Sequence, residues 1–211
     1  MGNINNVGVI LMGNNALPPG LGDDLFAFKI NYNSLVNGGD DHVDPLYNGN
    51  ISQILWKTAS DNKMRGYVYE YDRLNRLTDA IYYKNDGNPY SGNYNEHVAY
   101  DLNGNITSLN RYGGYETQSL PDEMDILSYT YNSNSNLLVK VVDDGQDNTG
   151  FIDSPTNTSN DYTYDANGSM ISDKNKGITS IKYNHLNLPS RILFENNDFI
   201  EYTYNAVVLA P

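Results

Sequence analysis

Residues 162–173, YTYDANGSMISD, contain every feature on which the fold prediction depends. Two tyrosines alternate at the end of a strand, and Asp165 follows the second one. An Asp side chain can hydrogen-bond the backbone ahead of it and so begin a turn, while Asn167 and Gly168 tolerate the positive φ that reverses the chain. The segment that follows has the pattern of a returning strand. We therefore predict a β-hairpin in this stretch.

The same pattern recurs along most of the chain. It is found again in residues 69–79 (YEYDRLNRLTD), 98–109 (VAYDLNGNITSL), 129–141 (YTYNSNSNLLVKV), 181–192 (IKYNHLNLPSRI) and, cut short, 202–205 (YTYN). We use the second aromatic residue as a marker, which gives the marker tyrosines Tyr71, Tyr100, Tyr131, Tyr164, Tyr183 and Tyr204. Their spacings are 29, 31, 33, 19 and 21 residues, so we interpret the shorter spacing as the basic unit.

The residues that define the repeat are predicted to be structural. Tyrosines end the strands, and Asp, Asn and Gly form the turns. These residues are Tyr69, Tyr71, Asp72, Asn75, Tyr100, Asp101, Gly104, Tyr129, Tyr131, Asn132, Tyr162, Tyr164, Asp165, Gly168, Tyr183, Asn184, Tyr202 and Tyr204. We expect neighbouring tyrosine rings to stack in ladders along the sheet, at about 0.5–1.5 kcal/mol per pair, with each hydroxyl reaching water or a backbone carbonyl.

The longer intervals between markers contain clusters of Gly, Asn and Asp, in residues 84–95 and 143–161. We interpret them as extended hairpin loops, because the entropy of loop closure rises slowly with loop length. A single hairpin is marginally stable in water, so the units must pair edge to edge. No convincing amphipathic helix is present. The predicted fold is all-β, with consecutive antiparallel β-hairpins in an open sheet.

The predicted organisation has two parts. Residues 1–46 form a loop-rich preamble with one or two strands, including a strand candidate at 25–33. Residues 47–211 form the repeat array, in which the last repeat is truncated. At its start, the turn signal of Asn48, Gly49 and Asn50 leads into an apolar strand that carries Trp56.

Composition and charge exclude several functional classes. The chain has 211 residues with 19 Tyr and 18 Gly, a mixture that favours strands and turns. Its net charge is −13 and its pI about 4.4, so nucleic acid is not an expected partner. With 0 Cys it can form neither a disulfide nor a thiolate metal site. We find no apolar run of about 18 residues and no basic start of a signal peptide, so neither a membrane span nor secretion is encoded in this chain.

On these motifs the sequence resembles the RHS, or YD-repeat, family. The stretches YEYDRLNRLT, AYDLNGNIT and YTYDANGSMISD follow the family's repeat closely, and the resemblance extends over residues 47–205. It implies a curved β-sheet, which spirals into a hollow shell in complete members. Bacterial members enclose a C-terminal toxin in that shell, and animal relatives use it in adhesion. The resemblance therefore implies a parent protein that is secreted or at the cell surface, to which this chain contributes an arc of wall.

Two departures from the family pattern limit what is carried over. The Asp-Pro-x-Gly-Leu motif of self-cleavage is absent and only Asp44-Pro45 occurs, so self-processing is not predicted. After Asn205, where a turn glycine and a return strand are expected, the sequence reads AVVLAP. We interpret the chain as a fragment or a truncated array.

Asp72, Asp101 and Asp165 could suggest the acid pair of a glycosidase, which places two carboxyl groups about 5–10 Å apart. The same repeat position holds asparagine in the other three repeats, and an amide cannot act as an acid. The turn-forming interpretation is therefore preferred.

Metal sites and further catalytic motifs receive little support. A calcium site is conceivable in an Asp-rich run, but the run lacks the spacing of an EF-hand loop, and we interpret it as a solvated loop. Its members are Asp143, Asp144, Asp147 and Asp153. The histidines His42, His97 and His185 show no metal-ligand spacing. Because GxSxG, HExxH, GxGxxG and GxxxxGK are all absent, we predict neither a cofactor nor a metal.

Three hypotheses about function follow. In the preferred one, the chain is a non-enzymatic structural module that encloses or presents a partner polypeptide and pairs through its sheet edges with further repeats of the same or another chain. The alternative is an extracellular carbohydrate- or protein-binding module that uses a tyrosine-rich face. The third is a glycoside hydrolase, which requires two converging acids in a pocket.

Overall fold

The computed structural model describes residues 26–35, 44–85, 91–114, 120–145, 150–153 and 159–205. Within these ranges the chain consists of strands and turns, without a helix. The strands are β1 (Phe26–Asn31), β2 (Gln53–Thr58), β3 (Met64–Tyr71), β4 (Leu77–Lys84), β5 (Glu96–Tyr100), β6 (Ile106–Gly113), β7 (Asp122–Tyr131), β8 (Leu138–Asp143), β9 (Tyr162–Tyr164), β10 (Met170–Asp173), β11 (Ile178–Tyr183), β12 (Pro189–Phe194) and β13 (Phe199–Glu201).

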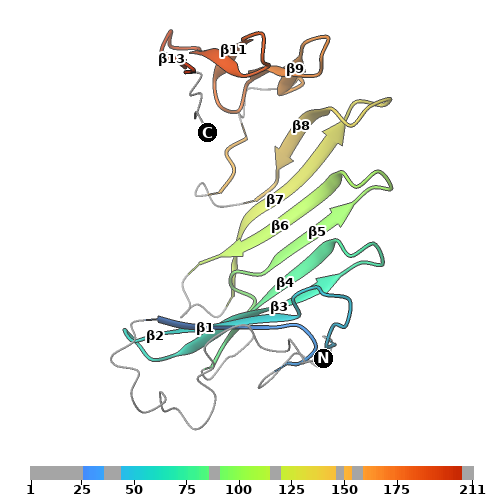
Figure 1. Cartoon of the computed structure of the whole chain (residues 1–211), viewed down its shortest axis with the longest axis vertical. Helices are drawn as coiled ribbons and strands as arrows, with labels where there is room; N and C mark the ends of the chain where they lie inside the picture. The colour runs from blue at the N-terminus through green and yellow to red at the C-terminus, as the bar shows by residue number, and fades with distance from the viewer. Residues whose placement is uncertain are drawn as a thin grey trace, which may run out of the picture.

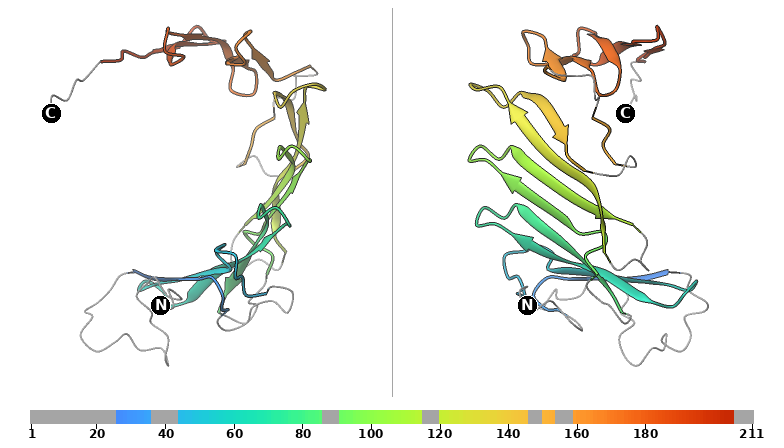
Figure 2. Two further views of the ribbon diagram at one scale, coloured as in Figure 1. Left: turned by 45° about the vertical axis from the view of Figure 1, so that its right-hand side comes forward. Right: turned by 180° about the vertical axis from the view of Figure 1, so that it is seen from behind.

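The strands pair strictly in chain order. β1 to β8 form an eight-stranded sheet and β9 to β13 a five-stranded sheet, and every pairing is antiparallel. Figure 1 shows the hairpins stacked one above another, and in the left view of Figure 2 the two sheets follow one another along an arc. The sheets do not close on themselves, so β1 and β13 lie at the two ends. The predicted all-β fold of consecutive hairpins in a curved, open sheet is confirmed.

Hydrogen bonds from the residue before β9 and a buried cluster from β7, β8 and β9 join the two sheets. The Asp161 amide donates to the Val139 carbonyl at 2.8 Å, and one Asp161 carboxylate oxygen accepts the Val141 amide at 2.7 Å. Leu127, Val141 and Tyr162 form a buried cluster across the same junction. The array therefore continues from one sheet into the next.

Strand alternation gives the array two different faces. We call the face that carries the marker tyrosines the tyrosine face. On β7 and β8 it also carries Leu127 and Val141, which are buried, whereas Ser128 and Thr130 on the opposite face of β7 are exposed. This is the period-two pattern of a strand with one apolar side.

The two ends of each hairpin also differ. The short turns that follow the marker tyrosines of β3, β5 and β7 lie along one margin of the sheet, on the right in Figure 1. The longer connections, which include residues 91–95 and 150–153, lie at the other margin. In the five-stranded sheet that margin has four-residue turns at 174–177 and 195–198. The marker spacings of 19 and 21 thus belong to units closed by short turns at both ends.

Several sequence predictions lie outside the described residues. They concern most of the preamble, the middles of the long loops, the last six residues, His42 and Asp147. Within the described part, β1 lies inside the strand candidate at 25–33, and Trp56 lies in β2, as expected.

Candidate functional site

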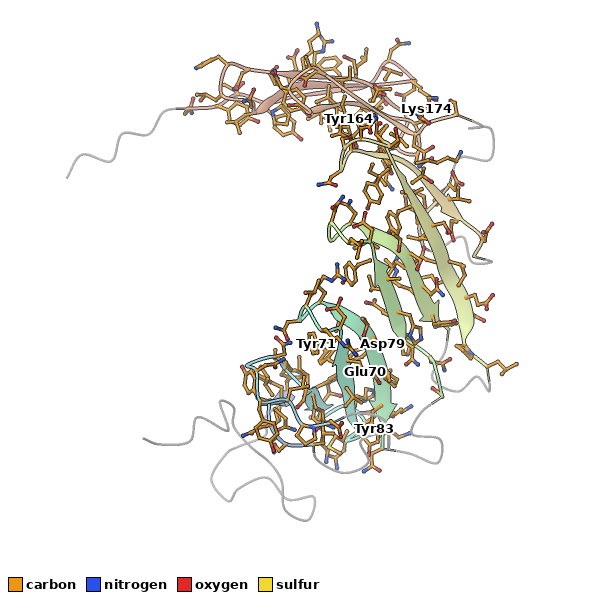
Figure 3. The ribbon with its side chains drawn as sticks, turned by 90° about the vertical axis from the view of Figure 1, so that its right-hand side faces the viewer. Glu70, Tyr71, Asp79, Tyr83, Tyr164 and Lys174 are labelled. Carbon is orange, nitrogen blue, oxygen red and sulfur yellow. The ribbon has the colours of Figure 1, made fainter. Side chains whose placement is uncertain are left out.

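The hydroxyl groups of the marker tyrosines form a ladder that joins successive hairpins. Each hydroxyl donates a hydrogen bond to a carbonyl at or just before the return strand of the preceding hairpin, over 2.7–3.0 Å. The pairs are Tyr71 to Ile51, Tyr100 to Leu77, Tyr131 to Ile106, Tyr164 to Leu138, Tyr183 to Met170 and Tyr204 to Pro189. Tyr71 and Tyr164, labelled in Figure 3, belong to the eight-stranded and the five-stranded sheet respectively. We call this series the tyrosine ladder.

The tyrosine ladder has a fixed sequence spacing. In most units the accepting carbonyl lies six residues after the marker of its own hairpin, as Leu77 follows Tyr71. The interval is seven for Leu138 after Tyr131, because the turn there contains one more residue. Turn length and ladder geometry are therefore linked.

The predicted packing of neighbouring tyrosine rings along the sheet occurs across strands between Tyr67 and Tyr82, but it does not run through the marker tyrosines. None of the ring contacts among the described residues joins two markers, and stacked tyrosines such as Tyr67 and Tyr69, or Tyr202 and Tyr204, lie on one strand. Successive markers stand two strands apart, which is about 9–10 Å. Because that exceeds the roughly 4.5–7 Å range of ring packing, the hydroxyl group makes the connection instead.

The aspartates at the turn positions hold their own turns. One carboxylate oxygen of Asp72 accepts the amides of Leu74 and Arg76, at 2.8 and 3.0 Å. Asp101 and Asp165 accept the amides two and four residues ahead in the same way, and the amide oxygen of Asn184 does so too. In the longer turn, the described hydrogen bonds of Asn132 are all made by its backbone amide and carbonyl, and none by its side chain. The carboxylates of Asp72, Asp101 and Asp165 thus bond the backbone of the turns in which they lie.

Positive φ occurs at one fixed place in these turns. It is +61° at Asn75, +92° at Gly104, +82° at Gly168 and +57° at Asn187. A type I turn followed by one left-handed residue closes a hairpin with a bulge, and Gly and Asn adopt that conformation most readily. The register shift at the end of each such hairpin agrees with this arrangement.

Hydrogen bonding lowers the pKa values of two turn carboxylates. The pKa of Asp72 lies below its usual value because the Arg76 backbone amide bonds it, with a smaller contribution from the Arg76 side chain. The pKa of Asp101 is lowered mainly by its bond to the Asn105 side chain. Both groups are therefore anionic at neutral pH.

Neighbouring turns are also linked to one another. Arg76 binds Asp72 through Nε at 2.6 Å, donates to the Asp101 carbonyl at 3.0 Å and lies 4.5 Å from the centre of the Tyr100 ring. Asparagine side chains make two further links, Asn48 to Asn75 at 2.7 Å and Asn105 to Asn136 at 3.0 Å. The turn margin is thus a connected polar row.

An aromatic cluster that the repeat motif does not predict lies in the first hairpins. Trp56 packs on Tyr67 at 5.9 Å, and Tyr82 packs edge-on against both Tyr67 and Tyr94. The Tyr67 hydroxyl donates to the Tyr94 carbonyl, and the Tyr94 hydroxyl donates to the Gly114 carbonyl. Burial raises the pKa of Tyr67 to about 12. The available signal was the position of Tyr67, which continues the alternation of Tyr69 and Tyr71 by one more step.

A buried carboxylate, Asp125, was also missed. It pairs with the Arg111 guanidinium across β6 and β7, and its other oxygen accepts the Phe151 amide at 2.5 Å. Of the Asp-rich run, Asp143 accepts the amides of Ile126 and Gly145. In the part of the chain that the structure describes, no three His, Cys, Asp or Glu side chains are grouped as metal ligands.

The described histidines differ in setting. His97 Nδ1 lies 2.5 Å from Asp79 Oδ1, and its ring meets Tyr112 edge-on. His185 is exposed in a turn.

The hairpin formed by β1 and β2 follows the same plan as the later units. In the β3–β4 hairpin, Glu70 precedes the marker tyrosine by one residue and pairs with Asp79, which lies two residues after the ladder acceptor. Asn31 and Gln53 pair in the same way in the β1–β2 hairpin. By this register Tyr32 occupies the marker position, and Ile51 already accepts the Tyr71 hydroxyl. Hairpin pairing thus includes residues that sequence analysis assigned to the preamble, and the pair Tyr32-Asn33 was the overlooked signal.

No protein-family model matches the sequence, and no curated protein matches it. The described residues include no helix with the length and hydrophobicity needed to cross a membrane.

Proposed function

We propose that the chain is a non-enzymatic structural module, a segment of the wall of an RHS-type, or YD-repeat, β-shell that encloses or presents a partner polypeptide. The parent protein is secreted or exposed at the cell surface. The observation that carries this proposal is the tyrosine ladder, which fixes each hairpin to the one before it. A wall built from many similar units needs such a repeated joint, because each unit contacts only its neighbours.

The distribution of burial supports a wall. Among the described residues, eight hydrophobic side chains are buried, and they are spread from Leu55 to Tyr162. The end strands expose apolar side chains, Phe26 and Phe28 on β1 and Phe199 and Ile200 on β13. Edge strands with exposed backbone and apolar groups favour pairing with another chain.

The turn aspartates support the absence of catalysis. Asp72, Asp101 and Asp165 each direct an oxygen at two backbone amides of their own turns. A glycosidase acid must instead face a sugar across a shared site.

Light scattering over a concentration series, with circular dichroism on the same samples, tests the proposal. We expect a β-rich spectrum and an apparent mass that rises with concentration. Ile200→Lys, which places a charge in the middle of β13, should suppress the rise. Leu186→Lys is the matched control, because Leu186 is exposed in a turn and not on an edge strand. A chain that remains monomeric at every concentration would contradict the edge-pairing basis of the proposal.

A binding module is the second candidate, and one observation favours it. Tyr202 and Tyr204 stack at 6.4 Å and are 45% and 44% exposed, which resembles an aromatic platform for a sugar. A glycan array tests it, and the double variant Tyr202→Ala, Tyr204→Ala should abolish any signal. Tyr47→Ala serves as the control, because Tyr47 is exposed elsewhere. An array without signal for the unmodified chain rules out glycan binding under those conditions.

A further inference from the structure

The outer edge of β1 is the starting point. Among the described strands β1 pairs with β2 alone, so no described strand lies beside its second edge. Phe26 and Phe28 stack at 6.1 Å on the tyrosine face and are 56% and 47% exposed. Such a pair of exposed aromatic rings beside an unpaired edge is a typical interaction surface.

The later hairpins indicate what normally covers these positions. Counted back from the marker, Phe28 corresponds to Tyr67, four residues before Tyr71. Tyr67 packs on Trp56, and the Tyr71 hydroxyl donates to the Ile51 carbonyl. Both partners belong to the return segment that precedes β3.

Tyr32 lacks the corresponding bond. Six later tyrosines donate to such a carbonyl, whereas the Tyr32 hydroxyl donates to no residue that the structure describes. The equivalent acceptor for Tyr32 would come from a return strand on the open side of β1.

Four of the internal joints share a register, whereas the β10–β11 joint differs from them by one residue, with Asp173 opposite Ile178. The residue three after the ladder acceptor pairs with the residue four before the marker tyrosine. The pairs are Ile54 with Tyr67, Ala80 with Glu96, Leu109 with Leu127 and Ile192 with Ile200. Four joints with one register give a rule that can be applied to β1.

We propose that the open edge of β1 binds the return strand of another YD hairpin, antiparallel and in this register. The first carbonyl of the incoming strand accepts the Tyr32 hydroxyl, and its fourth residue lies opposite Phe28. The inference rests on the proposed function and specifies the partner at one end of the wall.

The occupant is a return strand for a topological reason. Both end strands of the described array, β1 and β13, lead toward a marker tyrosine, so neither is a return strand. A second copy therefore offers no return strand at a described end of its array.

Disulfide trapping tests the register. The chain has 0 Cys, so Phe28→Cys introduces a single thiol. The probes are capped peptides of residues 51–58, ISQILWKT, with one cysteine at the third, fourth or fifth position. We expect the fourth position, which is that of Ile54, to crosslink at least about tenfold faster than its neighbours, because only facing residues approach within disulfide distance. Equal crosslinking rates at all three peptide positions would overturn the proposed register. If the peptides crosslinked faster to the Ile200→Cys variant, whose thiol is on β13, than to Phe28→Cys, the assignment to β1 would be overturned.

Affinity tests the tyrosine bond. Binding of the fluorescently labelled, cysteine-free peptide to the full chain should weaken about fivefold in Tyr32→Phe, the loss that corresponds to one ordinary hydrogen bond. Tyr47→Phe is the matched control and should leave binding unchanged. Binding that Tyr32→Phe does not alter would overturn the hydroxyl contact. If the peptide fails to bind while the chain still self-associates through β13, this inference fails and the proposed function stands; if neither occurs, both fail.

Discussion

The eight-stranded and the five-stranded sheet use the same joint but differ in how much they bury. In the first, buried side chains occur on both faces, as Val68 and Tyr82 on adjacent strands show. In the second, burial is confined to Asp161 and Tyr162 at its beginning, among the residues described there. The tyrosine ladder runs through both. The comparison indicates that the ladder is the constant element of the array, and that a buried core is added locally.

The largest difference between the sheets should appear in their ion pairs. Asp125→Ala leaves the Arg111 charge and the Phe151 amide without their buried partner, and we expect a loss of about 3–5 kcal/mol in the free energy of unfolding. Glu201→Ala removes the exposed pair with Arg191 in the five-stranded sheet and should cost less than about 1 kcal/mol. Urea unfolding followed by circular dichroism measures both.

Asp125→Asn serves as an additional control, because it keeps an oxygen for the Phe151 amide while removing the charge. Its cost should fall between the other two. Equal, small losses for Asp125→Ala and Glu201→Ala would mean that the buried contacts of Asp125 contribute no more than an exposed ion pair.

Core packing should give the second largest contrast. Leu127→Ala opens a cavity in the cluster with Val141 and Tyr162, at about 2–5 kcal/mol. Leu188→Ala in the five-stranded sheet, where the side chain is 38% exposed, should cost less than about 1 kcal/mol. The same unfolding assay measures both variants, and similar losses would contradict the conclusion that the eight-stranded sheet has the larger buried core.

Single bonds of the tyrosine ladder should contribute less. Tyr131→Phe removes one partly buried hydroxyl bond and should cost about 1 kcal/mol. Tyr204→Phe removes an exposed bond at the end of the array and should cost less. Thermal unfolding of the two variants compares them, and a larger loss for Tyr204→Phe would refute the idea that internal joints matter most.

The smallest change at neutral pH is expected from exchanging the turn residues of the two sheets. Asp101→Asn should leave stability at pH 7 nearly unchanged, because Asn184 holds the equivalent turn with an amide oxygen. The folded-state pKa of Asp101 is depressed, so its contribution is present above the unfolded value of 3.8 and is lost as the pH falls below it. Asp101→Asn should therefore flatten the decline of stability in acid.

Asn184→Asp is the reciprocal variant and should steepen that decline. Unfolding measured from pH 7 to pH 2 records both slopes. An acid slope that neither exchange alters would show that other carboxyl groups dominate it.

Local chemistry made part of this structure predictable. Asp165 and Gly168 specify their turn within five residues, so the hairpin followed from the sequence. The tyrosine ladder depends on which carbonyl a neighbouring hairpin places beside each hydroxyl, which is a long-range property. Tyr32 was overlooked because 19 positions separate it from Ile51, whereas Tyr71 and Leu77 are six apart. Asp125 carries no sequence signal of burial, since its partners Arg111 and Phe151 come from other segments.

Every bond of the tyrosine ladder points the same way along the chain, from a later hairpin to an earlier one. A polypeptide leaves the ribosome N-terminus first, and domains fold in that order. Each acceptor carbonyl therefore leaves the ribosome before its tyrosine does. The array can therefore assemble from its N-terminal end, with each new hairpin docking on the hairpin that precedes it in the chain.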